Sequence, residues 1–358
     1  MRVAVAYEAG QPLVLEDLPV PDIGPRDVLV GVSASGICHT DLHVIEGKSA
    51  LPLPIVPGHE ACGIVEATGS DVRRVKPGDR VLASVSPACG TCWWCVNGMS
   101  NHCELNASVK AAQRFTLPTG QTAGAVCGVG TFAEAMVVHE ASLVPVRTDL
   151  IDTELALLGC GVTTGLAAAL NTAQVAPGSS VAVIGCGGVG QSVIQGARIG
   201  GAAVIIAVDP MRTRREGAVG AGATHTVDPA ATDPIDAVRE LTAGRGADYT
   251  FEVVGRPELM VAAFEMARTA GTVTLVGMPA VTDMLTLPAI KAVFSGKRLA
   301  GAALGGAQIL RDFPKFIRLA ETGRLDLTSM VSQQITLDEI NKGIDMVNRA
   351  EGVRTVIV

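Results

Sequence analysis

The sequence predicts an α/β protein with two domains, and three observations support this prediction. The chain has 358 residues, which exceeds the size of most single domains. Its first ~160 residues hold short β-type runs closed by proline and glycine, which indicates a β-rich, barrel-like domain with long loops. From about Val162, short buried strands alternate with helical stretches, which is typical of βα units around a doubly wound parallel sheet.

The βα pattern continues almost to the end of the chain. Apolar strands are expected at 181–185, 202–209, 249–255, 271–277 and 298–304, and a helix is expected at 257–270. Two amphipathic helices, at 309–325 and 337–352, and a last strand at 354–358 follow. The first 22 residues predict two strands with a turn at Gly10-Gln11-Pro12.

Composition and charge exclude several classes of function. The formal net charge is -7, which argues against nucleic acid as a main partner because phosphate-binding surfaces usually carry a basic excess. The N-terminal segment lacks the apolar core of a signal peptide. The uncharged stretch from Leu155 to Ala197 is broken by polar residues and glycines, so it offers no clean span of ~20 apolar residues. We therefore expect a soluble, cytoplasmic protein without a membrane partner.

A glycine-rich turn predicts a dinucleotide site. Gly185, Gly187 and Gly190 form G-x-G-x-x-G, with Gly188 and Val189 between them, directly after a predicted strand and before a predicted helix. The first glycine makes the turn, the second lets the backbone approach a pyrophosphate, and the third lets helix and strand pack closely. Such a turn in another α/β fold remains the alternative.

The choice between NAD and NADP depends on the end of the next strand. Asp209 lies there, 24 residues after Gly185, where a carboxylate would accept a hydrogen bond from a ribose 2′-hydroxyl and repel a 2′-phosphate. Arginines, which NADP sites use, follow at Arg212, Arg214 and Arg215. The sequence favours NAD and leaves NADP possible.

Four of the nine cysteines predict a metal site. Cys89, Cys92, Cys95 and Cys103 have the spacing C-x2-C-x2-C-x7-C, which suits a closed tetrahedral zinc site of structural type. Iron–sulfur clusters also use C-x2-C runs, so the cysteines alone leave the metal open. An odd cysteine count without an export signal argues against a disulfide framework, and a dithiol redox site would need two cysteines.

A second, dispersed set of ligands is Cys38, His59 with Glu60, and Cys160. One histidine and two cysteines give three ligands and an open fourth position, which is typical of catalytic zinc; the Cys₂His set is a known example of such ligation in alcohol dehydrogenase. Taken singly, Cys38 and Cys160 would be buried small residues and His59 a loop histidine.

These motifs together resemble the zinc-dependent alcohol dehydrogenases of the medium-chain dehydrogenase/reductase superfamily over essentially the full length. The resemblance rests on "GICHTDLH", "PGHEACGIVEATGSDV", "KPGDRV", the cysteine segment, "LGCGVTTG", "VAVIGCGGVG" and "GVRTVIV". It implies a GroES-like catalytic domain at 1–161 and 304–358 and a Rossmann domain at 162–303. It also implies two zinc ions per chain, a nicotinamide cofactor and a dimer or tetramer.

The resemblance also implies roles for individual residues. Cys38, His59 and Cys160 would bind catalytic zinc, with Glu60 beside the metal as an occasional ligand and Asp41 holding the ring of His59. Thr40 would take the proton of the substrate hydroxyl, which would leave through the nicotinamide ribose and His43. Contacts with the cofactor are implied for His39 and Arg354 at the pyrophosphate, Thr164 near the nicotinamide and Arg214 near the adenosine ribose.

The expected reaction is the interconversion of an alcohol and its aldehyde by hydride transfer to and from NAD. A primary alcohol with an aromatic, allylic or long apolar group is expected, because family alignment places small apolar residues along the substrate channel, at Val85, Val126, Cys127, Ala303 and Leu304. The alternative is a thiol-dependent formaldehyde dehydrogenase of the mycothiol or glutathione type. Glutathione-dependent members carry an arginine after the fourth cysteine, where this chain has Glu104, Leu105 and Asn106.

Three other classes of protein fit the sequence less well. A zinc-free quinone or enoyl reductase of the same superfamily would lack the ligands at Cys38, His59 and Cys160, and all three are present. A nucleic-acid-binding zinc protein conflicts with the acidic balance and with the dinucleotide motif. A non-catalytic member would have no need of the complete relay and ligand set.

Overall fold

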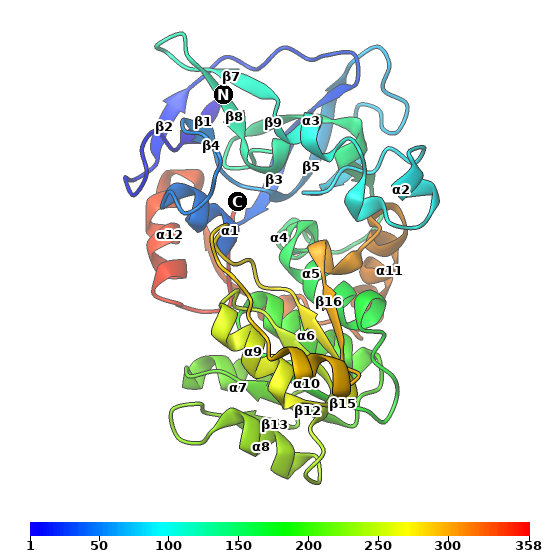
Figure 1. Ribbon diagram of the computed structural model, residues 1–358. Helices are drawn as coiled ribbons and strands as arrows, with labels where there is room; N and C mark the ends of the chain where they lie inside the picture. The colour runs from blue at the N-terminus through cyan, green and yellow to red at the C-terminus, as the bar shows by residue number, and fades with distance from the viewer. The chain divides into compact units, whose positions relative to one another are not determined.

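The computed structural model describes residues 1–358, and the chain divides into two compact units (Figure 1). Unit 1 comprises Met1–Gly161 and Gln308–Val358, and unit 2 comprises Val162–Ala307. The predicted boundary between residues 303 and 304 lies four residues before the observed one. The segment up to Gly306 stays with unit 2, because Thr172 Oγ1 donates a hydrogen bond to Gly305 O at 2.9 Å.

Unit 1 is built around a seven-stranded sheet whose central strand is the ten-residue β3. The strand order is β10-β6-β5-β3-β18-β17, and β9 also pairs with β3. The path begins at β10, ends at β17 and does not close, so the expected barrel is an open sheet. The strands are β3 (Asp27–Gly36), β5 (Glu60–Thr68), β6 (Arg80–Ala83), β9 (Ala135–His139), β10 (Leu143–Pro145), β17 (Val331–Ile335) and β18 (Arg354–Ile357).

Two small sheets and several helices complete unit 1, which is therefore β-rich but not all-β. The N-terminal strands β1 (Arg2–Val5) and β2 (Val14–Asp17) pair antiparallel, as expected around the turn at Gly10. A three-stranded sheet has the order β4-β8-β7, formed by β4 (Ile55–Val56), β7 (Gln113–Thr116) and β8 (Thr122–Ala125). The α-helices are α1 (His39–Ile45), α2 (Trp93–Val96), α3 (Asn106–Lys110), α4 (Asp152–Ala156), α11 (Ile309–Glu321) and α12 (Ile340–Asn348). The 3₁₀ turns are η1 (Ser100–His102), η2 (Val126–Gly128), η3 (Glu140–Ser142), η4 (Leu157–Gly159), η7 (Thr328–Met330) and η8 (Leu337–Glu339).

Unit 2 is a six-stranded sheet in which every neighbouring pair of strands is parallel. The order is β13-β12-β11-β14-β15-β16, so the first and fourth strands along the unit lie side by side. This is the doubly wound order, in which ligands bind at the carboxyl ends of the strands where the winding reverses. The strands are β11 (Ser180–Ile184), β12 (Val204–Val208), β13 (His225–Val227), β14 (Ala247–Glu252), β15 (Ala267–Leu275) and β16 (Arg298–Gly301).

Helices cover both faces of this sheet because successive strand residues face opposite sides. Val181 and Val183 enter one hydrophobic cluster with Val193 and Ile194 of α6, whereas Ala182 enters the other cluster with residues of α8 and α9. The helix expected at 257–270 ends at Met266, since Ala267 begins β15. The helical segments are α5 (Gly161–Ala167), η5 (Ala168–Thr172), α6 (Gly188–Ile199), α7 (Arg212–Ala221), α8 (Pro234–Leu241), α9 (Pro257–Met266), α10 (Ala289–Phe294) and η6 (Ala303–Gly306).

The uncharged stretch that begins at Leu155 is largely interior. Leu155, Leu157 and Leu158 are fully buried, and so are most residues of the strand β11. No single helix is long and apolar enough to cross a membrane. Only the bent pair of helical segments 152–159 and 161–172 meets both criteria, and it does so only when the two are taken together.

Candidate active site and metal centres

Three separate parts of unit 1 bring Cys38, His59, Glu60 and Cys160 together. Cys38 caps the N-terminus of α1, His59 and Glu60 stand at the start of β5, and Cys160 follows the turn η4. One potential ligand atom from each of these four side chains lies within 4.8 Å of the others. The dispersed set identified in the sequence is therefore one cluster in space.

The carboxylate of Asp41 fixes the orientation of His59. Asp41 Oδ1 lies 2.9 Å from His59 Nδ1 and accepts a further hydrogen bond from Gly58 N at 2.9 Å. A carboxylate only accepts, so Nδ1 is the ring nitrogen that donates, and in the neutral ring Nε2 keeps its lone pair. His59 Nε2 is buried and has no hydrogen-bond partner. A metal ion at the cluster would satisfy this atom, so the donor set fits a metal.

The two thiols in the cluster share a hydrogen bond. A hydrogen bond from the Cys160 thiol is the main cause that holds the pKa of Cys38 well below its usual value. The same hydrogen bond, together with burial, raises the pKa of Cys160 well above its usual value. A cation between the two sulfurs would let both act as thiolates, which is the form that binds metal.

Glu60 is held by an ion pair that sequence analysis did not predict. Its Oε2 pairs with the guanidinium of Arg354 in β18, and its Oε1 accepts a hydrogen bond from Gly161 N at 3.0 Å. Burial raises the pKa of Glu60 to about 7, although Arg354 acts in the opposite direction. Arg354 is itself 6% exposed, and its observed role is to pair with Glu60. Its expected contact with a cofactor pyrophosphate stays a prediction.

The three remaining site residues of the first domain lie on α1. Thr40 and His43 are partly exposed and are three residues apart, which places them on the same face of the helix. His39 is exposed at the start of the helix. Their expected roles in proton transfer and cofactor binding stay predictions.

The four clustered cysteines form a second candidate metal centre. The Sγ atoms of Cys89 and Cys95 are 3.8 Å apart, and those of Cys92 and Cys103 are 3.9 Å apart. Four sulfurs at ~2.3 Å from a tetrahedral zinc ion would be separated by ~3.8 Å. A disulfide requires ~2.05 Å, so these distances fit a metal and exclude a bonded pair.

The glycine-rich turn of unit 2 has the geometry that a dinucleotide requires. Gly185 has a φ of +91°, a conformation that favours glycine, and a Cβ on Gly190 would lie 1.9 Å from Gly185 O. Gly187 caps α6, and a Cβ built there would meet no atom within 4 Å. The helix N-terminus is therefore open to a phosphate group. Gly188 and Val189 form the first turn of α6, and Thr164 lies partly buried in α5.

Asp209 follows β12 and is 2% exposed. Its Oδ2 accepts a hydrogen bond from Cys186 N and its Oδ1 accepts one from Met211 N, both at 2.8 Å. Arg214 Nη1 lies 3.9 Å from Asp209 Oδ2, whereas Arg215 pairs with Asp228 at 2.9 Å. The carboxylate thus braces the glycine-rich turn, and Arg214 is the arginine beside it.

Glu252 is a residue near the turn that sequence analysis missed. It is fully buried at the end of β14, opposite Ile184, which leads into Gly185. Glu252 Oε1 accepts hydrogen bonds from Val254 N and Gly255 N, while Oε2 has no partner, and burial raises its pKa. The signal in the sequence was an acidic residue inside the apolar run "YTFEVVG".

The expected channel residues differ in their burial. Val85 and Cys127 are partly exposed, but Val126 is fully buried in the hydrophobic core. Val126 is therefore corrected from a channel wall to a core residue. Ala303 is exposed and Leu304 is partly exposed in unit 2.

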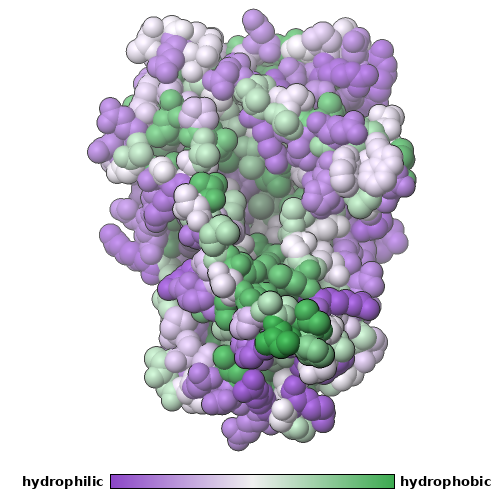
Figure 2. Space-filling model, in the orientation of Figure 1, coloured by the Kyte–Doolittle hydropathy of each residue, from purple (hydrophilic) through white to green (hydrophobic).

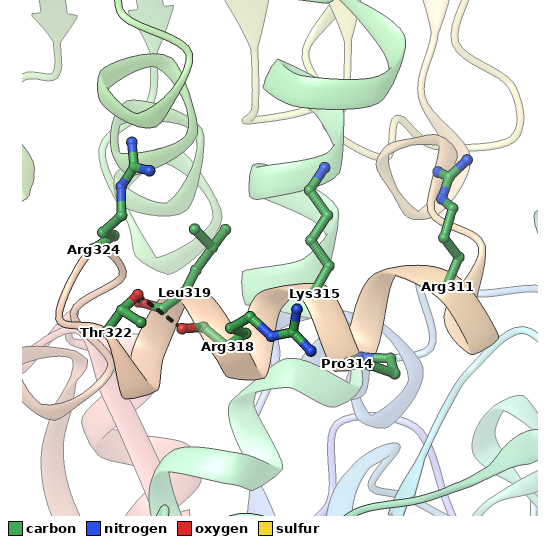
Figure 3. Close-up of a pocket in the computed structure, with 7 residues that line it drawn as sticks. All are labelled: Arg311, Pro314, Lys315, Arg318, Leu319, Thr322 and Arg324. Carbon is green, nitrogen blue, oxygen red and sulfur yellow. Dashed lines mark hydrogen bonds between the residues drawn. The ribbon is translucent and has the colours of Figure 1, made fainter.

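A hollow of about 540 Å³ lies along α11 of unit 1 and contains none of the candidate site residues (Figure 3). Its lining comes from one helix and the turn after it. Long side chains that extend from one face of the helix border the hollow, so it is a surface feature. The lining residues are Arg311, Pro314, Lys315, Arg318, Leu319, Thr322 and Arg324.

Comparison with known proteins places both units in known families. The alcohol dehydrogenase GroES-like domain family matches residues 24–148, and the zinc-binding dehydrogenase family matches residues 188–322.

Individual relatives match over nearly the whole chain. An NDMA-dependent alcohol dehydrogenase from Amycolatopsis methanolica is 37% identical over 100% of this chain and 98% of its own length. Alcohol dehydrogenase 6 from Peromyscus maniculatus is 35% identical over 100% of this chain and 97% of its own length. The crystal structure of benzyl alcohol dehydrogenase from Acinetobacter calcoaceticus has a TM-score of 0.92 and 30% identity, with 99% of this chain and 98% of that chain covered.

The family matches span both units, and the relatives align from end to end. The fold agrees with the matches, because a GroES-like unit holds the two candidate metal centres and a Rossmann-type unit holds the glycine-rich turn. The chain therefore belongs to the zinc-dependent alcohol dehydrogenases of the medium-chain dehydrogenase/reductase superfamily.

Proposed function

We propose that the protein interconverts a primary alcohol with an aromatic, allylic or long apolar group and its aldehyde, using NAD and catalytic zinc. The observation that carries this proposal is the buried, partnerless Nε2 of His59 in one cluster with Cys38 and Cys160. Similarity to a benzyl alcohol dehydrogenase supports the substrate class.

The residues of unit 1 would hold and tune the metal. Cys38, His59 and Cys160 would be its ligands, and the fourth position would remain for substrate because Arg354 holds the carboxylate of Glu60. When bound, zinc would polarise the substrate oxygen as a Lewis acid, and a nicotinamide would accept the hydride. Asp41 would keep His59 in the tautomer that binds metal.

Proton transfer would use the face of α1 that carries Thr40 and His43. The Thr40 hydroxyl would accept the proton of the substrate hydroxyl and give up its own proton, and the His43 imidazole would accept a proton from this relay and release one to solvent. Both side chains are partly exposed, so a proton can reach water from them. Gly187 and the start of α6 would receive the cofactor pyrophosphate, and Asp209 would stand near the adenosine ribose.

A comparison of kcat/KM values for several alcohols tests this function directly. Benzyl alcohol should give a kcat/KM at least ~10-fold above that of ethanol, which requires only about 1.4 kcal/mol of extra transition-state binding and follows from burying apolar surface at about 25 cal/mol per Å². Val85→Phe should shrink this ratio by filling the channel. Equal or better use of ethanol by the parent protein, or activity only with formaldehyde and an added thiol, would contradict the proposal.

Metal analysis tests the two centres separately. We expect about two zinc ions per chain. Cys95→Ser should lose one ion and lower thermal stability, because a structural zinc site contributes folding free energy. Cys160→Ser should lose the other ion and the activity while the melting temperature stays close to that of the parent. Iron in the purified protein, or full activity without metal, would refute the assignment.

Cofactor choice is tested at Asp209. Asp209→Asn removes the negative charge and keeps one side-chain oxygen, so it can accept one of the two backbone hydrogen bonds, from Cys186 N or from Met211 N. The ratio of kcat/KM with NADP to that with NAD should rise several-fold, because Arg214 is then free to meet a 2′-phosphate. The exposed Asp236→Asn on α8 is the control and should leave the ratio unchanged. A parent enzyme that already prefers NADP would disprove the role of Asp209.

We also propose that the protein forms homo-oligomers through α10 and the edge strand β16 of unit 2. Large apolar side chains are exposed there, which include Val293 at 72% and Phe294 at 79%, and α10 buries none of its residues. Figure 2 shows this hydrophobic surface in green. β16 ends the sheet and has a strand partner on one side only. A second copy of the chain would cover the helix and continue the sheet.

Light scattering during gel filtration tests this surface. The parent protein should have a mass at least twice the 36.7 kDa of one chain. Phe294→Glu should shift it towards one chain, because an interface cannot bury an unpaired charge at low cost. Val219→Glu changes an exposed apolar residue on α7 and should leave the mass of the parent unchanged. A monomeric parent would exclude this interface.

A further inference from the structure

The cysteine segment contains no charged side chain of its own. Residues 81–103 hold no aspartate, glutamate, lysine or arginine. A divalent zinc ion with four thiolates carries a formal charge of about -2. Backbone N–H groups supply part of the compensation: Thr91 N and Cys92 N donate to Cys89 Sγ at 3.4 and 3.3 Å. The segment itself supplies no full cation.

Arg74, in the connection between β5 and β6, reaches the base of this segment. Its Nη2 donates a hydrogen bond to Ala88 O at 2.6 Å, and Ala88 directly precedes Cys89. Its Nη1 donates to Ala141 O at 3.0 Å, in the turn η3. One guanidinium therefore joins the first cysteine to the body of unit 1.

The charge of the same side chain interacts favourably with the negative groups around it. Partial burial lowers the pKa of Arg74, whereas Glu140 and three of the four cysteines, Cys89, Cys95 and Cys103, act to raise it. An arginine side chain stays protonated at any physiological pH. Glu140 is the one acidic neighbour, and it also pairs with Arg26 at 2.9 Å. Arg26, Arg74 and Glu140 together carry one net positive charge.

The neighbouring arginine does not share this position. The Arg73 side chain donates to Ser70 O and Val72 O, both at 2.9 Å, and is exposed. Two consecutive arginines thus have different environments, and only Arg74 bonds to the cysteine segment. This contrast supplies a matched control within the chain.

We propose that Arg74 is a positioning residue of the Cys89–Cys103 metal site, which anchors Cys89 and offsets part of the negative charge of the zinc–thiolate centre. The proposal rests on the proposed zinc occupancy of that site. Partners of this kind, outside the ligands themselves, typically change metal affinity by 10–100-fold when they are removed. A lysine side chain has a single nitrogen and cannot bridge Ala88 O and Ala141 O with two separate nitrogens as the guanidinium does.

The test is zinc release to a chromophoric chelator from the parent, Arg74→Met, Arg74→Lys and Arg73→Met. The kinetic phase of zinc release that is absent in Cys95→Ser belongs to the zinc ion of the cysteine segment. Arg74→Met should release this zinc ~10–100-fold faster than the parent. Arg74→Lys should lie between them because it keeps the charge, and the difference between Lys and Met should shrink at high salt. Arg73→Met should match the parent, and the second zinc should be released at the same rate in every variant.

Two outcomes separate this inference from the proposed function. A parent that holds no zinc in the cysteine segment overturns both the zinc assignment and the role of Arg74. Two zinc ions in every protein, with equal release from the parent and Arg74→Met, overturn the role of Arg74 alone. If Arg74→Met does not fold, Arg74→Lys and Arg73→Lys decide: equal release from these two overturns the proposal.

Discussion

The carboxylate of Asp41 holds the metal-binding cluster of unit 1 in place. It accepts hydrogen bonds from Cys38 N, Gly58 N and His59, and it is fully buried. One side chain therefore ties the first turn of α1 to the start of β5, which are the two elements that carry Cys38 and His59. A buried carboxylate is tolerated only when its oxygens are satisfied, and here three donors surround it. Rotation of this group would release the helix and the imidazole together.

Several charged side chains lie close together around Asp41 in the interior of unit 1. Asp41, Glu60 and the two thiolates would carry four negative charges, and Arg354 supplies one positive charge. A divalent cation brings the group close to neutrality. Because isolated charges are costly to bury, this arrangement is stable only when the charges are paired in this way. Without a cation the cluster would keep uncompensated negative charge, whereas a bound divalent metal ion would offset most of it.

Local motifs could be predicted from the sequence, whereas long-range pairs could not. The turn at Gly185 follows from three glycines within six residues, and the cysteine segment follows from its own spacing. The ion pair of Glu60 and Arg354 joins residues 294 positions apart, so no spacing rule connects them. Val126 was misplaced because its neighbours in the core come from distant segments such as α12. The open path of the large sheet likewise depends on the pairing partners of β10 and β17, which their short apolar sequences do not specify.

Unit 1 is interrupted in the sequence by the whole of unit 2. Its strand β18 lies between β3 and β17 and brings Arg354 to Glu60, yet it consists of residues 354–357. Unit 2 ends at Ala307, so the nascent chain can form the parallel sheet while the other sheet still lacks the strand that joins β3 to β17. The countercharge of Glu60 is therefore synthesised after Cys38, His59 and Cys160. Until β18 pairs with β3, the carboxylate of Glu60 lies beside the candidate ligands without the arginine that offsets its charge.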